Sequence, residues 1–359
     1  MSLSAITVEP IRPADREDVT HFLVTFPRGP TLSVEQWAEH LRQRWDENPA
    51  FSPDWPQGWV IRKDGHVKGF FGSIPRWLWV DGELRRSANA TTWYVLPECG
   101  AQALKQLLAF SHAPAAAYFN TTAIEKIWRL LEANRFQKFP EVSTASVLVV
   151  DPGPLAAQRM RGPLARLSPL ALALGRVVRP ALRLPLLISR LTGGGTRGVE
   201  ATTVTSADQR FDELWARVRP SSGITADRSA ASLNWYLRTN RRLERVLIAA
   251  TQDTRLAGYA LFAQQANPSF VRWDCVDVIL ESPSPWILRA LVEGAWAECR
   301  RRGVAMALLP HWTESLEMLY RSLSLPRRAI TSEGRYLKLG PGVAGPLQLP
   351  SDFYGDYGL

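Results

Sequence analysis

The chain has 359 residues, more than one ordinary hydrophobic core supports, so its length favours two domains. Hydrophobic residues make up 46% and charged residues 21%, which argues against global disorder. The formal net charge is +9, but the stretch from Pro152 to Val199 holds eight arginines and no acidic residue. The rest of the chain is nearly neutral, and this distribution argues against a nucleic-acid-binding domain, which would need a basic face on a folded domain.

The cysteines and the N-terminus point to one compartment. Cys99, Cys275 and Cys299 lie far apart, with no CxxC pair and no histidine at zinc spacing, so we expect free thiols and no metal. The first residues lack the basic and apolar regions of a signal peptide, and no run of about 18 uncharged apolar residues occurs. We therefore expect a cytoplasmic protein.

The first half predicts strands and helices in a definite order. Ser33, followed by Gln36 three residues later, predicts a capped helix start, and Asp64-Gly65 between two apolar runs predicts a hairpin. The predicted elements are a strand at 6–12, helices from 13 and over 33–44, strands at 58–62, 67–74 and 84–95, a helix after the loop at 96–102, a strand at 115–120, a helix at 123–133 and a strand at 139–150.

The second half repeats this order at an offset of about 189 residues. Gly258-Tyr259 falls opposite Gly69-Phe70, and Tyr320 falls opposite Leu131. The predicted elements are a strand at 201–205, helices at 211–218 and 229–238, strands at 246–251, 256–262 and 270–280, a helix at 285–302, a strand at 305–310 and a helix at 314–324.

This order of elements resembles the Gcn5-related N-acetyltransferase (GNAT) superfamily in both halves. The segments Asn120-Thr121-Thr122-Ala123 and Ser232-Leu233-Asn234-Trp235-Tyr236 are similar to the tandem FemAB-like and polysaccharide-associated acyltransferases. The resemblance implies an α/β fold of two tandem domains, each a mixed, mostly antiparallel sheet flanked by helices. We predict domains at 1–151 and 200–340, a basic linker at 152–199 and a C-terminal tail at 341–359.

The resemblance also implies an acyl-CoA site at the loop between the long strand and the following helix of the first half. A strand that runs into a helix start presents backbone amides suited to a diphosphate. Gly100, Ala101 and Ala103 permit close approach, and Lys105 adds a cation where the family's arginine is absent. The predicted contacts are Val95, Leu96, Glu98, Gly100, Ala101, Gln102, Ala103, Lys105 and, at the end of the next strand, Asn120. A turn kept only for packing is the alternative.

The matching loop of the second half, 281–285, contains Pro283 and Pro285, which remove amide donors. We therefore expect no CoA there. The strand at 270–280 does offer a candidate base. Alternation puts Asp277 on one face with Trp273, Cys275 and Ile279, so its carboxylate suits a general base or a polar anchor. Pairing with a buried donor is the structural alternative.

Tyr320 is the second catalytic candidate. Leu319-Tyr320 resembles a family signature whose tyrosine protonates the sulfur of CoA, whereas Leu131 occupies this place in the first half. Acyl transfer to an amine needs such a proton for the leaving thiolate. The predicted cofactor loop and the predicted proton donor thus lie in different halves.

The segment 160–197 predicts a contact with the membrane surface. Residues 164–179 have the pattern of a short basic amphipathic helix, which suits the inner face of an anionic membrane, while a packed linker is the alternative.

Taken together, these features lead us to expect an N-acyltransferase that uses acetyl-CoA or another acyl-CoA on an amine of a small molecule, sugar or cell-envelope precursor. A FemAB-like aminoacyl transferase and a non-catalytic scaffold are the alternatives.

Overall fold

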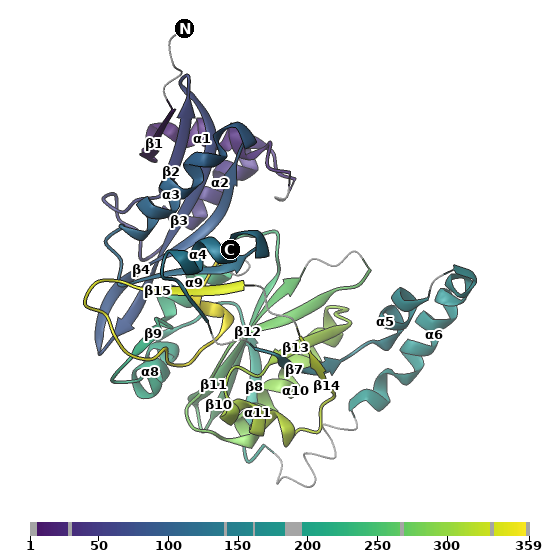
Figure 1. Ribbon diagram of the computed structural model, residues 1–359. Helices are drawn as coiled ribbons and strands as arrows, with labels where there is room; N and C mark the ends of the chain where they lie inside the picture. Colours follow the sequence, from purple (N-terminus) through teal and green to yellow (C-terminus); the bar gives the residue numbers. More distant parts are fainter. Residues whose placement is uncertain are drawn as a thin grey trace.

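The computed structural model describes residues 6–27, 31–139, 142–160, 162–183, 196–265, 269–330 and 334–356. These residues form two mixed β-sheets with helices packed against them, and a helical arm projects from the second sheet (Figure 1). The predicted α/β class with two sheets is confirmed.

The first sheet has the strand order β1-β2-β3-β4-β5-β15-β6, and β9 pairs with β3. The capping box predicted at Ser33 and Gln36 is present at the start of α2. The elements of the N-terminal half are β1 (Ile6–Pro10), α1 (Arg16–Leu23), α2 (Val34–Arg44), β2 (Gly58–Lys63), β3 (His66–Val80), β4 (Glu83–Val95), α3 (Ala103–Ser111), β5 (Ala117–Ala123), α4 (Glu125–Ala133), β6 (Gln137–Lys138) and β7 (Thr144–Val149).

The second sheet has the order β14-β7-β13-β12-β11-β10-β8. Its long helix α10 packs on the sheet through a core cluster that includes Leu288, Leu291 and Trp296. The elements of the C-terminal half are β8 (Val199–Val204), α8 (Gln209–Val218), β9 (Ile224–Ala226), α9 (Ala230–Arg238), β10 (Arg245–Gln252), β11 (Arg255–Gln265), β12 (Arg272–Leu280), α10 (Pro285–Arg301), β13 (Met306–Pro310), α11 (Glu314–Arg321), β14 (Arg327–Ala329) and β15 (Gly334–Leu339).

The two halves exchange a strand. β7 from the N-terminal half lies in the second sheet between β13 and β14, and β15 from the C-terminal half lies in the first sheet between β5 and β6. The predicted domain ranges place these strands with their own halves, whereas the hydrogen bonds place each in the opposite sheet. A continuous buried cluster that includes Leu78, Phe119, Leu247, Leu261 and Tyr354 joins both sheets and the C-terminal tail.

The segment predicted as a linker folds in part into a helical hairpin. We call α5 (Pro152–Arg159) and α6 (Ser168–Val178), with the short 3-10 turn Gly162–Leu167 between them, the arm. Figure 1 shows the arm extending away from both sheets. Residue 161 and residues 184–195 of the predicted membrane segment lie outside the described residues. Within the described residues, no helix combines the length and hydropathy needed to span a bilayer.

Candidate functional site

Each sheet contains one place where two parallel strands separate. In the first sheet, β4 and β5 pair only from Ser87–Ala117 to Asn89–Phe119. In the second sheet, β12 and β13 pair only from Arg272–Met306 to Asp274–Leu308. We call these places the first fork and the second fork. Beyond them, one edge of β4 and one edge of β12 lose their neighbouring strand, so backbone amide and carbonyl groups there are open to another partner.

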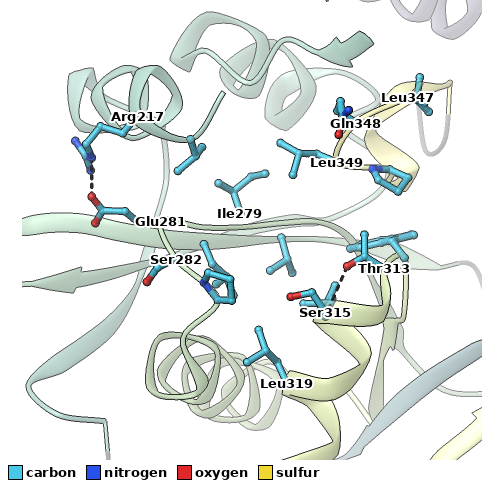
Figure 2. A pocket seen from close by; sticks show the side chains of 17 residues that line it. Arg217, Ile279, Glu281, Ser282, Thr313, Ser315, Leu319, Leu347, Gln348 and Leu349 are labelled. Atoms are coloured by element: carbon cyan, nitrogen blue, oxygen red, sulfur yellow. Dashed lines mark hydrogen bonds and ion pairs between the residues drawn. The ribbon is translucent and has the colours of Figure 1, made fainter. Parts of the chain in front are cut away.

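The second fork holds a cavity of about 740 Å³. Figure 2 shows side chains converging on it from the end of β12, the start of α11, the end of α8 and the C-terminal tail. Most of its wall is apolar, which suits a slender organic ligand. The lining residues are Arg217, Val218, Val278, Ile279, Leu280, Glu281, Ser282, Pro283, Trp312, Thr313, Ser315, Leu316, Leu319, Leu347, Gln348, Leu349 and Pro350.

Polar groups gather at one end of the cavity. Arg217 donates to the Glu281 carboxylate at 2.9 Å, and Arg255 donates to the same carboxylate at 2.9 Å, which leaves two cations to one anion. Ser282 has no hydrogen-bond partner among the described residues. On the opposite side, which Thr313 marks in Figure 2, the neighbouring Trp312 has a buried indole N–H that lacks an acceptor in the described part of the chain. A ligand with acceptor groups would satisfy these donors.

The start of α10 lies at the same end. Ser284 caps this helix, since its hydroxyl accepts from the amide of Ile287 at 3.3 Å. Pro285 occupies the first helical position, where no amide donor is required. The two prolines therefore limit the amides available to an anion, as the sequence indicates, but they leave the cavity between the strands open.

Tyr320 lies on α11, one residue beyond Leu319 of the cavity wall. Its side chain is fully buried, stacks on His311 with 5.4 Å between ring centroids, and has no partner for its hydroxyl among the described residues. Burial raises the pKa of Tyr320 well above its ordinary value, so the phenol stays protonated at neutral pH. It does not line the cavity itself.

Asp277 is committed to an internal ion pair. Arg228 donates to its carboxylate through Nε at 2.8 Å and Nη2 at 3.0 Å, and the Tyr259 hydroxyl donates at 2.7 Å. Burial alone would lower the pKa of Arg228, but the Asp277 carboxylate outweighs it and holds that pKa above its ordinary value. Arg228 also donates to the carbonyl of Leu349 at 2.9 Å. The pair thus anchors the tail that forms one wall of the cavity.

A β-bulge corrects the predicted face of Asp277. The register with β11 jumps from Leu261–Asp277 to Phe262–Cys275, so Val276 has no opposite residue. The extra residue reverses the alternation: Trp273 and Cys275 belong to the cluster under α10, and Ile279 belongs to the cluster between the sheets. The expectation that Trp273, Cys275, Asp277 and Ile279 share one face is therefore wrong.

The predicted cofactor loop of the first half forms a 3-10 turn, Pro97–Gln102, that runs directly into α3. The turn uses amides of its own: Cys99 donates to the Leu96 carbonyl at 2.9 Å, and Ala103 donates to Gly100. The predicted contacts follow one another along the end of β4, this turn and the start of α3: Val95, Leu96, Gln102 and Ala103 are half-buried, and Glu98, Gly100, Ala101 and Lys105 are exposed.

Asn120 does not end its strand, as the sequence predicts, because β5 continues to Ala123. It directly follows the last residue that pairs with β4, and it pairs instead with Tyr336 of β15. The strand is longer than predicted because the exchanged strand supplies hydrogen bonds to its other edge. Asn120 is thus at the first fork, where the prediction places it, but within a paired strand.

The C-terminal tail reaches the first fork. The Thr121 hydroxyl of β5 donates to the Asp356 carboxylate at 3.1 Å, and Arg76 donates to the Gly355 carbonyl at 2.9 Å. Burial raises the pKa of the Asp356 carboxyl, and the nearby Arg44 opposes this rise. A Cβ added to Gly355 would lie 1.8 Å from Oγ1 of Thr121, so the tail is held closely against the strand.

Sequence reasoning missed the tail at both forks. Residues 347–350 line the second-fork cavity and residues 355–356 contact the first fork. The tail gives little sequence signal, because it forms hardly any regular structure and its partners are distant in the chain. The cluster Asp352-Phe353-Tyr354 was the available sign, since two aromatic residues in a short tail favour docking on a core.

Comparison with known proteins gives a consistent fold. No protein-family model and no curated protein matches the sequence. Among solved structures, the chain is similar to a GCN5-related N-acetyltransferase from Anabaena variabilis (12% identity, TM-score 0.54, 93% of this chain and 73% of that one). It is also similar to a GCN5-related N-acetyltransferase from Kribbella flavida (11%, 0.52, 94% and 71%) and to Saccharomyces cerevisiae N-myristoyltransferase with bound myristoyl-CoA (11%, 0.51, 98% and 85%).

These similarities extend over nearly the whole chain, so both sheets belong to the shared architecture. The chain has the GNAT fold, as the order of its predicted elements indicates. At such low identity the comparisons concern the fold, and function has to be argued from the site.

Proposed function

We propose that this chain is an acyl-CoA-dependent N-acyltransferase and that the acyl-pantetheine arm lies in the cavity of the second fork. One observation carries the proposal: beyond Asp274 and Leu308 the parallel strands separate around an apolar cavity of about 740 Å³. An open strand edge beside an apolar wall suits an extended chain that contains amide groups. We thus assign the ligand to the C-terminal half, for which the sequence predicts no CoA binding.

The residues of the cavity fit this ligand. The edge of β12 beyond Asp274 offers backbone groups to the pantetheine amides, and Leu316 and Leu319 offer apolar contact. Arg217 and Ser282 stand at the end where a diphosphate would lie. The group when bound supplies a thioester carbonyl that is activated toward an amine.

We propose Tyr320 as the source of the proton needed by a leaving thiolate, which requires its phenol, now behind the cavity wall, to reach the ligand. Its phenol is protonated at neutral pH, has no competing acceptor among the described residues, and lies on the helix that supplies Leu316 and Leu319 to the wall. We assign Asp277 a positioning role, because Arg228 and Tyr259 occupy its carboxylate. With Tyr320 and the cavity in one half, the proposal no longer needs a site shared between halves.

For the acceptor we propose an amine on a small molecule, saccharide or cell-envelope precursor. Thr313, Ser315 and Gln348 add hydroxyl and amide groups to a mainly apolar wall, which suits a hydroxyl-rich acceptor. An aminoacyl-tRNA has less support, since Arg217 is the one cationic side chain in the wall and a nucleic-acid backbone needs a broader basic surface.

Titration calorimetry with acetyl-CoA and a longer acyl-CoA tests the proposal. Leu319→Trp fills the cavity and should weaken binding at least about 100-fold, a loss of roughly 2.7 kcal/mol. Met318→Trp is the matched control, because Met318 neighbours Leu319 on the same helix but is 65% exposed.

Gly100→Glu tests the first-half loop. A Cβ at Gly100 meets nothing within 4 Å, so the substitution leaves the fold intact while it would repel a diphosphate. We expect it to bind like the unchanged protein. If Gly100→Glu abolishes binding and Leu319→Trp does not, the cofactor lies at the first fork. If neither ligand gives heat at millimolar concentration, the chain is a scaffold.

A further inference from the structure

The arm exposes an apolar surface that no described part of the chain covers. Seven of the thirteen large hydrophobic side chains that stand exposed among the described residues belong to it. They are Leu164, Leu167, Leu170, Leu172, Leu174, Val177 and Val178, and Val177 alone is 77% exposed. An exposed apolar cluster of this kind marks an interaction site rather than ordinary surface.

The packing of the two arm helices leaves this surface free. Ala171 and Gly175 face α5, where a Cβ added to Gly175 would lie 2.3 Å from the backbone nitrogen of Gly153. With 3.6 residues per turn, Leu170 and Val177 then lie on the side of α6 away from α5, and Leu174 lies on the flank between the two sides. The helix therefore turns its small residues inward and its large apolar residues outward.

The arm's exposed charges are all positive. Arg159, Arg166 and Arg176 are exposed, and none has an acidic partner in the described part of the chain. Arg179 instead pairs with Asp151, whose carboxylate also caps α5 through the amide of Gly153. This pair closes the base of the hairpin, and Leu155 packs against Val147, Met306 and Leu308 of the second sheet. The arm is thus held at its base, with its basic and apolar surface directed outward.

We propose that the arm docks this protein on an anionic lipid membrane. Leucine and valine side chains would enter the interface while arginines meet phosphate headgroups, which is the pattern of interfacial helices. The absence of any acidic residue from Pro152 to Val199 removes repulsion by the lipid charge. The inference does not depend on acyl-CoA binding, because the arm and the second-fork cavity share no residue.

Vesicle co-sedimentation of the full chain tests the inference. We expect binding to vesicles that contain phosphatidylglycerol, weak binding to pure phosphatidylcholine, and loss of binding as salt is raised. Exchange of Arg159, Arg166 and Arg176 for glutamine should weaken binding about 100-fold. The same exchange at Arg12, Arg129 and Arg300 removes equal charge elsewhere and should change binding little.

Val177→Asp tests the apolar contribution and should abolish sedimentation, whereas Val24→Asp, at a residue 47% exposed on α1, should not. Equal binding by the arm variants and the unchanged protein would overturn the inference. So would binding that is equal on neutral vesicles. A dimer in sedimentation velocity that Val177→Asp dissociates, with no vesicle binding, would assign the surface to a second copy. Binding to oligonucleotides in place of vesicles would equally reject a lipid surface.

Discussion

The two forks share one topology, but the C-terminal tail packs against them differently. At the first fork, Gly355 and Asp356 press against β5, and the Asp356 carboxylate meets the hydroxyl of Thr121. At the second fork, residues 347–350 pass along one side and leave a cavity of about 740 Å³. Both sheets thus show the same separation of parallel strands, while the path of the tail gives the forks different surroundings.

The tail is fixed between the forks by a buried ion pair. Arg228 binds Asp277 of β12 and also reaches the Leu349 carbonyl and the Ser351 hydroxyl. Phe353 and Tyr354 then fill the core between the sheets. The ion pair therefore links the wall of the cavity to the segment that contacts the first fork, and its loss should affect both.

The largest effect we predict is that of Asp277→Ala. Removal of the carboxylate leaves the Arg228 charge buried without its anionic partner, which should cost about 3–5 kcal/mol of the free energy of unfolding. Urea denaturation measures this loss. The double variant with Arg228→Met should recover much of it, because no uncompensated charge then remains. A loss below about 1 kcal/mol for the single variant would contradict the tail-anchoring role.

Tyr320→Phe should separate catalysis from stability at the second fork. Removal of a proton donor should lower kcat about 100-fold. The free energy of unfolding should stay within about 1 kcal/mol, because the buried hydroxyl has no partner to lose among the described residues. Release of the CoA thiol gives the rate, and Tyr94→Phe in the first half serves as control. An unchanged rate would limit Tyr320 to packing.

Local sequence signals predicted most of the frame. The capping box at Ser33 and the turn at Asp64-Gly65 each depend on neighbours in the chain, and both appear in the structure. The repeated order of elements is built from such local patterns and also appears. The exchange of β7 and β15 depends on long-range pairing, which alternation within a strand does not encode. The bulge at Val276 shows the same limit, because one unpaired residue reverses the faces of everything after it.

The site was less predictable than the frame for a related reason. Pro283 and Pro285 remove backbone amide donors, and for that reason alone the sequence predicts no cofactor at 281–285. The cavity arises from the separation of β12 and β13 and from the position of residues 347–350, which are tertiary properties. Tyr320 was identified from its position in a family signature, but the sequence does not show that its side chain is buried.

Acidic pH should lower the free energy of unfolding through His40, a buried histidine of the first half. His40 of α2 is buried against Trp37, and burial lowers its pKa to about 2. Below the ordinary histidine value, the unfolded chain takes up a proton that the folded chain does not. Stability is therefore lost as pH falls from about 6.5, by up to about 1.4 kcal/mol per pH unit. His40→Gln should flatten this slope in denaturation at pH 4 to 7, and His66→Gln, at the exposed start of β3, should not.

Asp356→Asn at the first fork should give the smallest change, with the opposite dependence on pH. The pKa of this carboxyl is raised in the fold, so the folded state holds its proton more tightly than the unfolded state. Its contribution is favourable at low pH and falls as pH rises above the ordinary aspartate value. Asparagine keeps an acceptor for Thr121 and removes the desolvated charge, so the variant should gain up to about 1 kcal/mol at pH 7 and nothing near pH 3. Denaturation at both pH values, with Glu83→Gln as an exposed control, measures this difference. A loss of stability at pH 7 would mean that the attraction to Arg44 outweighs burial, and that the tail is held at the first fork by charge.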